Sequence, residues 1–179
     1  MGVVQRSVRG RMEDLRSVRT TPRLLLSIPC AADVIALFRF LGDRDAMRYT
    51  HVVDDLASCR HLVETHESQR ETVGCAPWVV RERETGEIVG WGGLYEDPFD
   101  RGWGIELGYF FAPRAWGRGL ATELAEVALS IARDELGLAK VSAFAHPENA
   151  RSHSVLRKAG FREQRFIPHM TRHLYERSL

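Results

Sequence analysis

The sequence predicts a single domain of mixed α/β structure, in the α+β class, and three observations support this prediction. Residues 105–121 pass from an alternating strand pattern, through a loop with two glycines, into an amphipathic helical pattern. Residues 75–83 and 87–94 have strand character and flank a short turn that ends in Gly86, which is typical of a β-hairpin. The length of 179 residues is enough for one sizeable core, and the sequence contains no internal repeat.

Composition and charge exclude several classes of protein. The content of 44% hydrophobic and 27% charged residues is ordinary for a globular domain, and a net charge of +1 gives the bulk chain no nucleic-acid footprint. No apolar run approaches membrane-spanning length, and the first residues lack the apolar centre of a signal peptide. Cys30, Cys59 and Cys75 are widely spaced and form no C-x-x-C motif, which favours free thiols in a reducing compartment. We therefore expect a cytoplasmic protein that binds neither membranes nor nucleic acid.

The N-terminal segment differs from the rest of the chain. Residues 1–19 contain five arginines, two acidic residues and little periodicity, so we expect a flexible arm followed by a single domain over residues 20–179. A nucleic-acid-binding role for this arm is the alternative, and it predicts a steep salt dependence of binding.

The remaining elements follow in order along the chain. A first strand at residues 21–26 precedes a helix at 31–40, whose first turn carries Asp33, and an irregular stretch at 42–58 leads to a second helix at 59–72. After the hairpin and the central strand, an apolar stripe from Leu120 to Ile131 predicts a helix that ends at Gly137. Further patterns predict a strand at 140–145, a helix at 150–159, and two final strands at 161–166 and 173–177.

The loop between the central strand and its helix has the chemistry of an anion site. Gly117 and Gly119 have no Cβ, so a ligand can approach the backbone closely, and Arg114 and Arg118 add positive charge. The first turn of the following helix presents unpaired N–H groups and the positive end of the helix dipole. A phosphate or pyrophosphate is the natural occupant, and the alternative is a simple turn with incidental arginines. A Rossmann loop is excluded by the missing third glycine, and a Walker loop by the absence of a Gly-Lys-Ser/Thr triplet.

Three motifs resemble one enzyme family. The sequence RAWGRGLA at residues 114–121 is similar to the Q/R-x-x-G-x-G/A loop of the GNAT acetyltransferases, which holds the pyrophosphate of acetyl-CoA. The sequence NARSHSVLRKAGF at residues 149–161 resembles the second conserved segment of the family, N-x-x-S-x-x-V-L-x-K-x-G-F. The opening TPRLLL at residues 21–26 resembles the branch that contains the ribosomal-protein N-acetyltransferases, the RimJ/RimL type.

This resemblance covers roughly residues 20–178 and implies a fold, a cosubstrate and a binding site. The implied GNAT fold has three layers, with a central twisted mixed sheet flanked by helices, and the strand at 105–111 is splayed from the strand at 140–145. The implied cosubstrate is acetyl-CoA, with no metal. The residues that the resemblance assigns to its binding are Phe111, Arg114, Trp116, Gly117, Arg118, Gly119, Ala121 and Asn149. Asn149 is also suited to capping the helix at 150–159, and the two roles are compatible.

Two residues are candidates for the chemistry of acetyl transfer to an amine. Glu106 lies on the central strand among apolar neighbours, where burial would raise its pKa toward that of a useful general base, and relatives of the RimJ/RimL type use a glutamate at the matching position. The alternative for Glu106 is a solvent-facing carboxylate paired with an arginine. Ser152 is the candidate donor to the leaving thiolate, because no tyrosine lies between Tyr109 and Tyr175; its alternative is helix capping or a contact with CoA.

The acceptor is the part of the reaction that the sequence defines least. Residues 42–58 and 95–104 are polar and aromatic, and we expect them to contact the acceptor. In the first segment, an acidic wall would suit a cationic amine and would consist of Asp43, Asp45, Asp54 and Asp55. The alternative for this segment is a solvated loop. The expected function is N-acetyl transfer from acetyl-CoA to a primary amine, either a protein N-terminus or a small molecule. The resemblance also implies that a homodimer can form. A non-catalytic acyl-CoA-binding module is the alternative from a different functional class.

Overall fold

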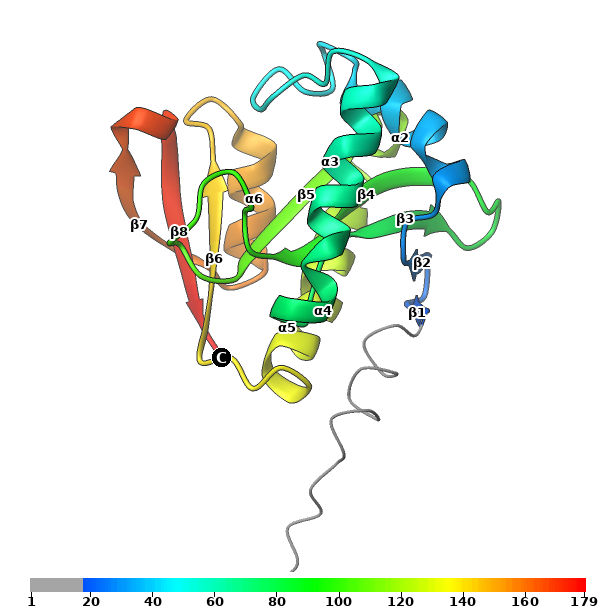
Figure 1. Cartoon of the computed structure of the whole chain (residues 1–179). Helices are drawn as coiled ribbons and strands as arrows, with labels where there is room; N and C mark the ends of the chain where they lie inside the picture. The colour runs from blue at the N-terminus through cyan, green and yellow to red at the C-terminus, as the bar shows by residue number, and fades with distance from the viewer. Residues whose placement is uncertain (1–17) are drawn as a thin grey trace, which may run out of the picture.

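The computed structural model describes residues 18–179, which form one eight-stranded sheet with helices on both faces (Figure 1). The strand order is β1-β2-β3-β4-β5-β6-β8-β7, and every neighbouring pair is antiparallel except β5 and β6. The strands are β1 (Arg19–Thr20), β2 (Leu24–Ser27), β3 (Trp78–Glu82), β4 (Ile88–Tyr95), β5 (Glu106–Phe111), β6 (Lys140–Ala145), β7 (Arg162–Ile167) and β8 (Arg172–Ser178). This is the mixed three-layer arrangement that the sequence predicts.

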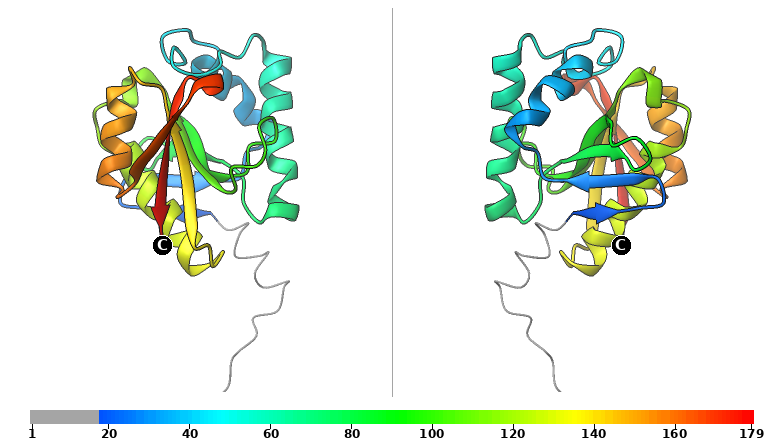
Figure 2. Two further views of the ribbon diagram at one scale, coloured as in Figure 1. Left: turned by 90° about the vertical axis from the view of Figure 1, so that its left-hand side faces the viewer. Right: turned by 90° about the vertical axis from the view of Figure 1, so that its right-hand side faces the viewer.

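The helices form two layers, one on each face of the sheet (Figure 2). One layer contains α2 (Val34–Leu41), which follows the 3₁₀ turn η1 (Ala31–Asp33), then α3 (Leu56–Ser68) and the short α4 (Arg70–Val73). The other layer contains α5 (Leu120–Asp134) and α6 (Ala150–Lys158), and two further 3₁₀ turns are η2 (Pro113–Ala115) and η3 (Pro168–Met170). None of the helices within residues 18–179 is both long enough and apolar enough to cross a membrane.

Each helical layer buries its own core against the sheet. The larger core joins α5 and α6 to strand residues such as Val80, Leu107 and Val141. The smaller core joins α2 and α3 to Trp91 and Ala112 on the opposite face. The central strands are therefore covered on both sides, which places the residues of β5 at the middle of the molecule.

Three element boundaries differ from the predictions. Arg19, expected in the flexible arm, pairs in β1 and its guanidinium contacts the Glu135 carboxylate at 2.6 Å; the rest of the arm, residues 1–17, lies outside the described residues. Residues 21–24 form a turn before β2, closed by the Thr21 N–H donating to the Leu24 carbonyl. The helix expected at 59–72 begins at Leu56, because the Asp55 carboxylate accepts a hydrogen bond from the Ser58 N–H at 2.7 Å and caps it.

Candidate active site

The parallel strands β5 and β6 separate soon after they meet. Both strands are fully described, and their one register pair is Glu106 opposite Ser142, held by the Ser142 N–H donating to the Ile105 carbonyl at 3.0 Å. On its other edge β5 pairs with β4 along its whole length. The splay that the resemblance implies is therefore present, and beyond Glu106 one edge of β5 faces a cavity of about 290 Å³ between β5, α5 and α6.

The glycine loop and the first turn of α5 form one end of this cavity. Gly117 and Gly119 have φ angles of 73° and 78°, a left-handed backbone that favours glycine, and Gly119 is the N-cap of α5. The first bond within the helix is Glu123 N–H to Gly119 carbonyl, so the N–H groups of the preceding turn are available to a ligand. An added Cβ at Gly117 would meet no atom within 4 Å, which leaves open space beside the backbone. This arrangement fits a pyrophosphate group.

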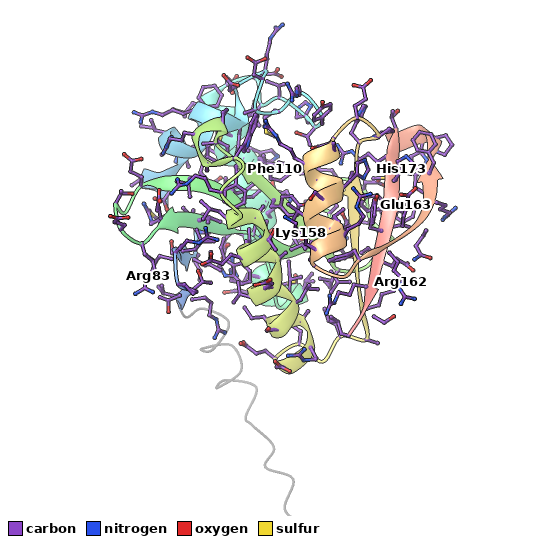
Figure 3. All side chains as sticks on the ribbon, turned by 180° about the vertical axis from the view of Figure 1, so that it is seen from behind. Arg83, Phe110, Lys158, Arg162, Glu163 and His173 are labelled. Carbon is purple, nitrogen blue, oxygen red and sulfur yellow. The ribbon has the colours of Figure 1, made fainter. Side chains whose placement is uncertain are left out.

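The positive charge that lines the cavity does not come from the two arginines of the loop. The Arg118 guanidinium makes an ion pair with Glu82, and that of Arg114 pairs with Glu87 at 3.2 Å, so both are directed toward the β3–β4 hairpin. The lining cations are instead Arg48, Arg151 and Lys158. The Arg151 guanidinium lies 4.8 Å from the centroid of the Trp116 ring, and Lys158 faces the region where α5 and α6 stand side by side (Figure 3).

Ser152 and Tyr109 form a pair of hydroxyl groups on the same cavity. Their oxygen atoms are 2.9 Å apart, and the Tyr109 hydroxyl also lies 3.3 Å from the Ser152 carbonyl oxygen. Burial raises the pKa of Tyr109 above its usual range, so this phenol stays protonated and can donate to Ser152. The Ser152 N–H donates to the Asn149 side chain at 3.1 Å, which confirms Asn149 as the cap of α6 while it also lines the cavity.

Glu106 lies on the opposite face of β5 from Tyr109 and is 5% exposed. Burial raises its pKa to about 8, helped by the negative charges of Asp97 and Asp100 and opposed by Arg172. The phenol of Tyr95 lies over Gly108, where an added Cβ would be 2.6 Å from the Tyr95 hydroxyl. Glu106 is therefore enclosed, and its pKa of about 8 lies near neutral pH. A general base that takes a proton from an amine needs a pKa in this range.

A second cavity, of about 740 Å³, lies on the same face of β5 as Glu106. We call it the acceptor cavity. Rings of His66, Trp91, Tyr95, Phe99 and Phe110 line it, together with Asp97 and Arg172. The two segments predicted to contact the acceptor, residues 42–58 and 95–104, both line this cavity. Met47 and His51 come from the first segment and Asp97 from the second. Glu106 does not line this cavity itself, but Tyr95, Asp97 and Arg172, which affect its pKa, do.

Comparison with known proteins identifies the family. The family model described as the acetyltransferase (GNAT) domain matches residues 23–162. The chain belongs to the GNAT acetyltransferases. It is therefore an acetyl-CoA-dependent acyltransferase, and the residues that line the cavity of about 290 Å³ fit that cosubstrate. We call this cavity the cosubstrate cavity.

Relatives of this GNAT protein agree in length as well as in sequence. The uncharacterized protein YkkB of Bacillus subtilis (strain 168) is 30% identical over 148 residues, which cover 82% of this chain and 86% of that protein. The uncharacterized N-acetyltransferase YoaA of the same organism is 24% identical over 146 residues, covering 80% and 82% respectively. The structure of Mycobacterium smegmatis RimJ in complex with CoA-disulfide has a TM-score of 0.73 at 20% identity, covering 87% of this chain and 81% of that chain, and shows the shared fold.

Most of the predicted site residues of this GNAT domain line one cavity, and the two loop arginines lie outside it. Arg114 and Arg118 do not line the cosubstrate cavity, contrary to the expectation that their charges face the ligand. The residues from the predicted set that do line it are Phe111, Trp116, Gly117, Gly119, Ala121, Asn149 and Ser152. The acidic acceptor wall is also corrected, since the Asp43 and Asp55 carboxylates accept backbone N–H bonds within their own turns and do not line the acceptor cavity.

The different positions of the arginines lead to a prediction about acetyl-CoA affinity. Arg151→Ala removes a cation that lines the cosubstrate cavity, and we expect it to weaken acetyl-CoA binding about ten-fold. Arg118→Ala is the matched control, because it removes the same charge from an ion pair outside the cavity, and we expect a change of less than about two-fold. Titration calorimetry with acetyl-CoA measures both, and equal losses would contradict the assignment.

Proposed function

We propose that the protein is an N-acetyltransferase that transfers acetyl from acetyl-CoA directly to a primary amine, with Glu106 as general base. The observation that carries the proposal is that the cosubstrate and acceptor cavities meet. Thr50 and Phe110 line both of them, beside the splay between β5 and β6. The two reactants can therefore approach each other at one point, with Glu106 on the acceptor side and Ser152 on the cosubstrate side.

We assign the acceptor of the amine proton and the donor to the thiolate to opposite faces of β5. Acetyl-CoA supplies a thioester; the amine nitrogen forms the new bond to its carbonyl carbon, and the bond from carbon to sulfur breaks. Glu106, directly or through water, takes the proton that the amine must lose. Ser152 donates a hydrogen bond toward the departing sulfur, while Tyr109 donates to Ser152 and holds its hydroxyl in place.

A covalent route through cysteine receives no support from the described thiols, since none of the three lines either cavity. Cys59 and Cys75 are buried and free, and burial raises the pKa of Cys59 to about 11 and that of Cys75 to about 12. Both are therefore protonated at neutral pH and poor nucleophiles. Free thiols also fit the cytoplasmic location that we propose.

Within the family we place this protein nearest the RimJ/RimL-type branch. The opening at residues 21–26, the glutamate at position 106 and the serine at position 152 support this placement. The placement leaves both classes of acceptor open, a protein N-terminus and a small molecule.

The role of Tyr109 gives a prediction about the departing thiolate. Tyr109→Phe removes the hydroxyl that orients Ser152, and we expect kcat to fall about three- to ten-fold with little change in the KM for acetyl-CoA. Ser152→Ala should reduce kcat by more, and the double variant should resemble Ser152→Ala because the two hydroxyls act in series. Additive losses in the double variant would show that Tyr109 acts independently.

The proposal is tested by following thiol release from acetyl-CoA in the presence of an amine panel of N-terminal peptides, amino acids, polyamines and aminoglycosides. Turnover with one class supports the proposal and identifies the acceptor chemistry. Absence of turnover with every class, while acetyl-CoA still raises the melting temperature, would contradict amine transfer but not cosubstrate binding.

A further inference from the structure

The acceptor cavity carries a specific combination of an aromatic wall and opposite charges. The Trp91 and Phe110 rings are stacked with centroids 5.9 Å apart. The His66 ring meets Trp91 edge-on at 5.0 Å and Tyr95 at 5.3 Å, and lies 5.9 Å from Phe99. These five rings form a continuous surface, and Phe99 at its edge is 62% exposed. A large exposed aromatic side chain beside a cavity gives an apolar ligand group a surface to cover.

His66 adds a neutral polar atom to this wall. Its Nδ1 lies 2.9 Å from the Leu62 carbonyl oxygen, which can only accept, so Nδ1 carries the proton and Nε2 is left as an acceptor. Burial lowers the pKa of His66, so the ring is uncharged at neutral pH. The wall therefore does not repel an ammonium group.

The charges in the cavity have opposite signs. Asp97 lines it as a carboxylate, and Glu106 lies behind it on the same face of β5. Arg172, at the start of β8, lines it as a cation. Among residues 18–179 the Arg172 guanidinium makes no hydrogen bond and no ion pair with another group, and its charge lowers the pKa of both Glu106 and Tyr95. A half-buried guanidinium without a bound carboxylate is a site for an anionic group of a ligand.

We propose, on the basis of the proposed function, that the acceptor is a free amino acid with a large apolar or aromatic side chain. Its amino group would lie toward Glu106 and Asp97, its carboxylate would pair with Arg172, and its side chain would pack on the ring wall. A protein N-terminus lacks the adjacent carboxylate, and a polyamine lacks both the carboxylate and the apolar body. The combination of ring wall and free arginine therefore distinguishes this acceptor from the other amines.

The test compares matched amines with matched arginine variants. L-phenylalanine, phenylalaninamide and phenethylamine share one ring but differ in the carboxylate, and L-alanine keeps the carboxylate but lacks the ring. We expect the wild type to have its highest kcat/KM with L-phenylalanine. Loss of Arg172 also raises the pKa of Glu106 and so slows transfer to every amine, and the comparison is therefore a ratio between two amines. Arg172→Met should lower kcat/KM for L-phenylalanine at least about ten-fold more than kcat/KM for phenethylamine. Arg172→Lys should restore part of the affinity for L-phenylalanine.

A control and a binding measurement separate this inference from the proposed function. Arg162→Met removes an exposed arginine from the neighbouring strand β7, outside the cavity, and should leave all four amines unaffected (Figure 3). Titration calorimetry of the CoA-bound protein with L-phenylalanine should show the same loss for Arg172→Met without turnover. Equal losses for L-phenylalanine and phenethylamine, or turnover confined to polyamines, peptides or aminoglycosides, would overturn the inference and leave amine transfer intact. Failure of every amine together with failure of acetyl-CoA to raise the melting temperature would overturn the proposed function itself.

Discussion

Glu106→Gln is expected to reduce turnover about 100- to 10,000-fold while the affinity for acetyl-CoA stays within about two-fold. The variant keeps the size and burial of the side chain but removes the carboxylate that accepts the amine proton. It leaves the cosubstrate cavity unchanged, because Glu106 does not line that cavity. Initial rates with saturating amine, together with calorimetric titration of acetyl-CoA, measure the two effects separately. Unchanged turnover would remove Glu106 from the mechanism.

The pH dependence of the wild type follows from the same residue. The raised pKa of Glu106, about 8, means that the base is mostly protonated at pH 6 and mostly ionised at pH 9. We therefore expect kcat/KM to rise about ten-fold per pH unit below pH 8 and to level off above it, with an additional contribution from the ionisation of the amine itself. In Glu106→Gln, the part of the pH dependence of kcat/KM that comes from the carboxyl group should disappear. An amine with a pKa well below 8 keeps the two contributions apart.

Stability gives a check on this pKa that does not depend on activity. A buried carboxyl with a raised pKa in the folded state contributes stability that is lost as pH rises from its ordinary value of 4.5 through about 8. Relative to the wild type, Glu106→Gln should therefore gain free energy of unfolding across this range, of the order of 3–5 kcal/mol when complete. Urea unfolding at pH 5 and pH 8.5 measures the difference. A constant difference between the two proteins would show that the pKa of Glu106 is not raised.

Gly119→Val is expected to weaken acetyl-CoA binding at least about 100-fold. The φ of Gly119 is 78°, and a β-branched side chain is strongly disfavoured there, so the loop must change its backbone to accept it. That change moves the N–H groups at the start of α5, and the new side chain also meets the Arg23 guanidinium, which lies 3.5 Å from an added Cβ. Acetyl-CoA titration and the melting temperature of the free protein measure the two consequences.

Gly137→Val is the matched control for this prediction. Gly137 has a φ of 64° and no atom within 4 Å of an added Cβ, and it follows the opposite end of α5, outside both cavities. The control carries the same kind of backbone strain and should lower the melting temperature without changing acetyl-CoA affinity. Equal loss of acetyl-CoA affinity in both variants would mean that the loop has no special role in binding.

The sequence predicts most of the fold because each element has its own local signal. Alternation identifies β5, the hairpin turn that ends in Gly86 identifies β3 and β4, and the amphipathic stripe from Leu120 to Ile131 identifies α5. The capping residue Asn149 and the glycine at position 160 bracket α6 closely. The errors occur at boundaries set by single side chains, such as the cap at Asp55, whose effect on the start of α3 is not visible in the hydrophobic pattern.

The site is less predictable because side-chain direction depends on tertiary contacts. Arg114 and Arg118 have the right charge in the right loop, yet Glu82 and Glu87 from a different hairpin direct them away from the cosubstrate cavity. Tyr109 is the partner of Ser152 that the sequence prediction lacks, although alternation with Glu106 places the Tyr109 side chain on the opposite face of β5, the face toward α6. Arg172 carried no sequence signal at all, since only the folding of β8 beside the acceptor cavity gives it a role.

Direct transfer between the two cavities is the central claim, and a rapid-quench experiment with acetyl-labelled CoA tests it most directly. The protein is loaded with one equivalent of the labelled cosubstrate, mixed with the best amine from the panel, and quenched at intervals. We predict that the label moves from CoA to the amine in one phase and never accumulates on the protein, and that Glu106→Gln slows this phase at least about 100-fold. Label that accumulates on the protein at a rate matching turnover, or a Glu106→Gln phase as fast as the wild type, would contradict the account.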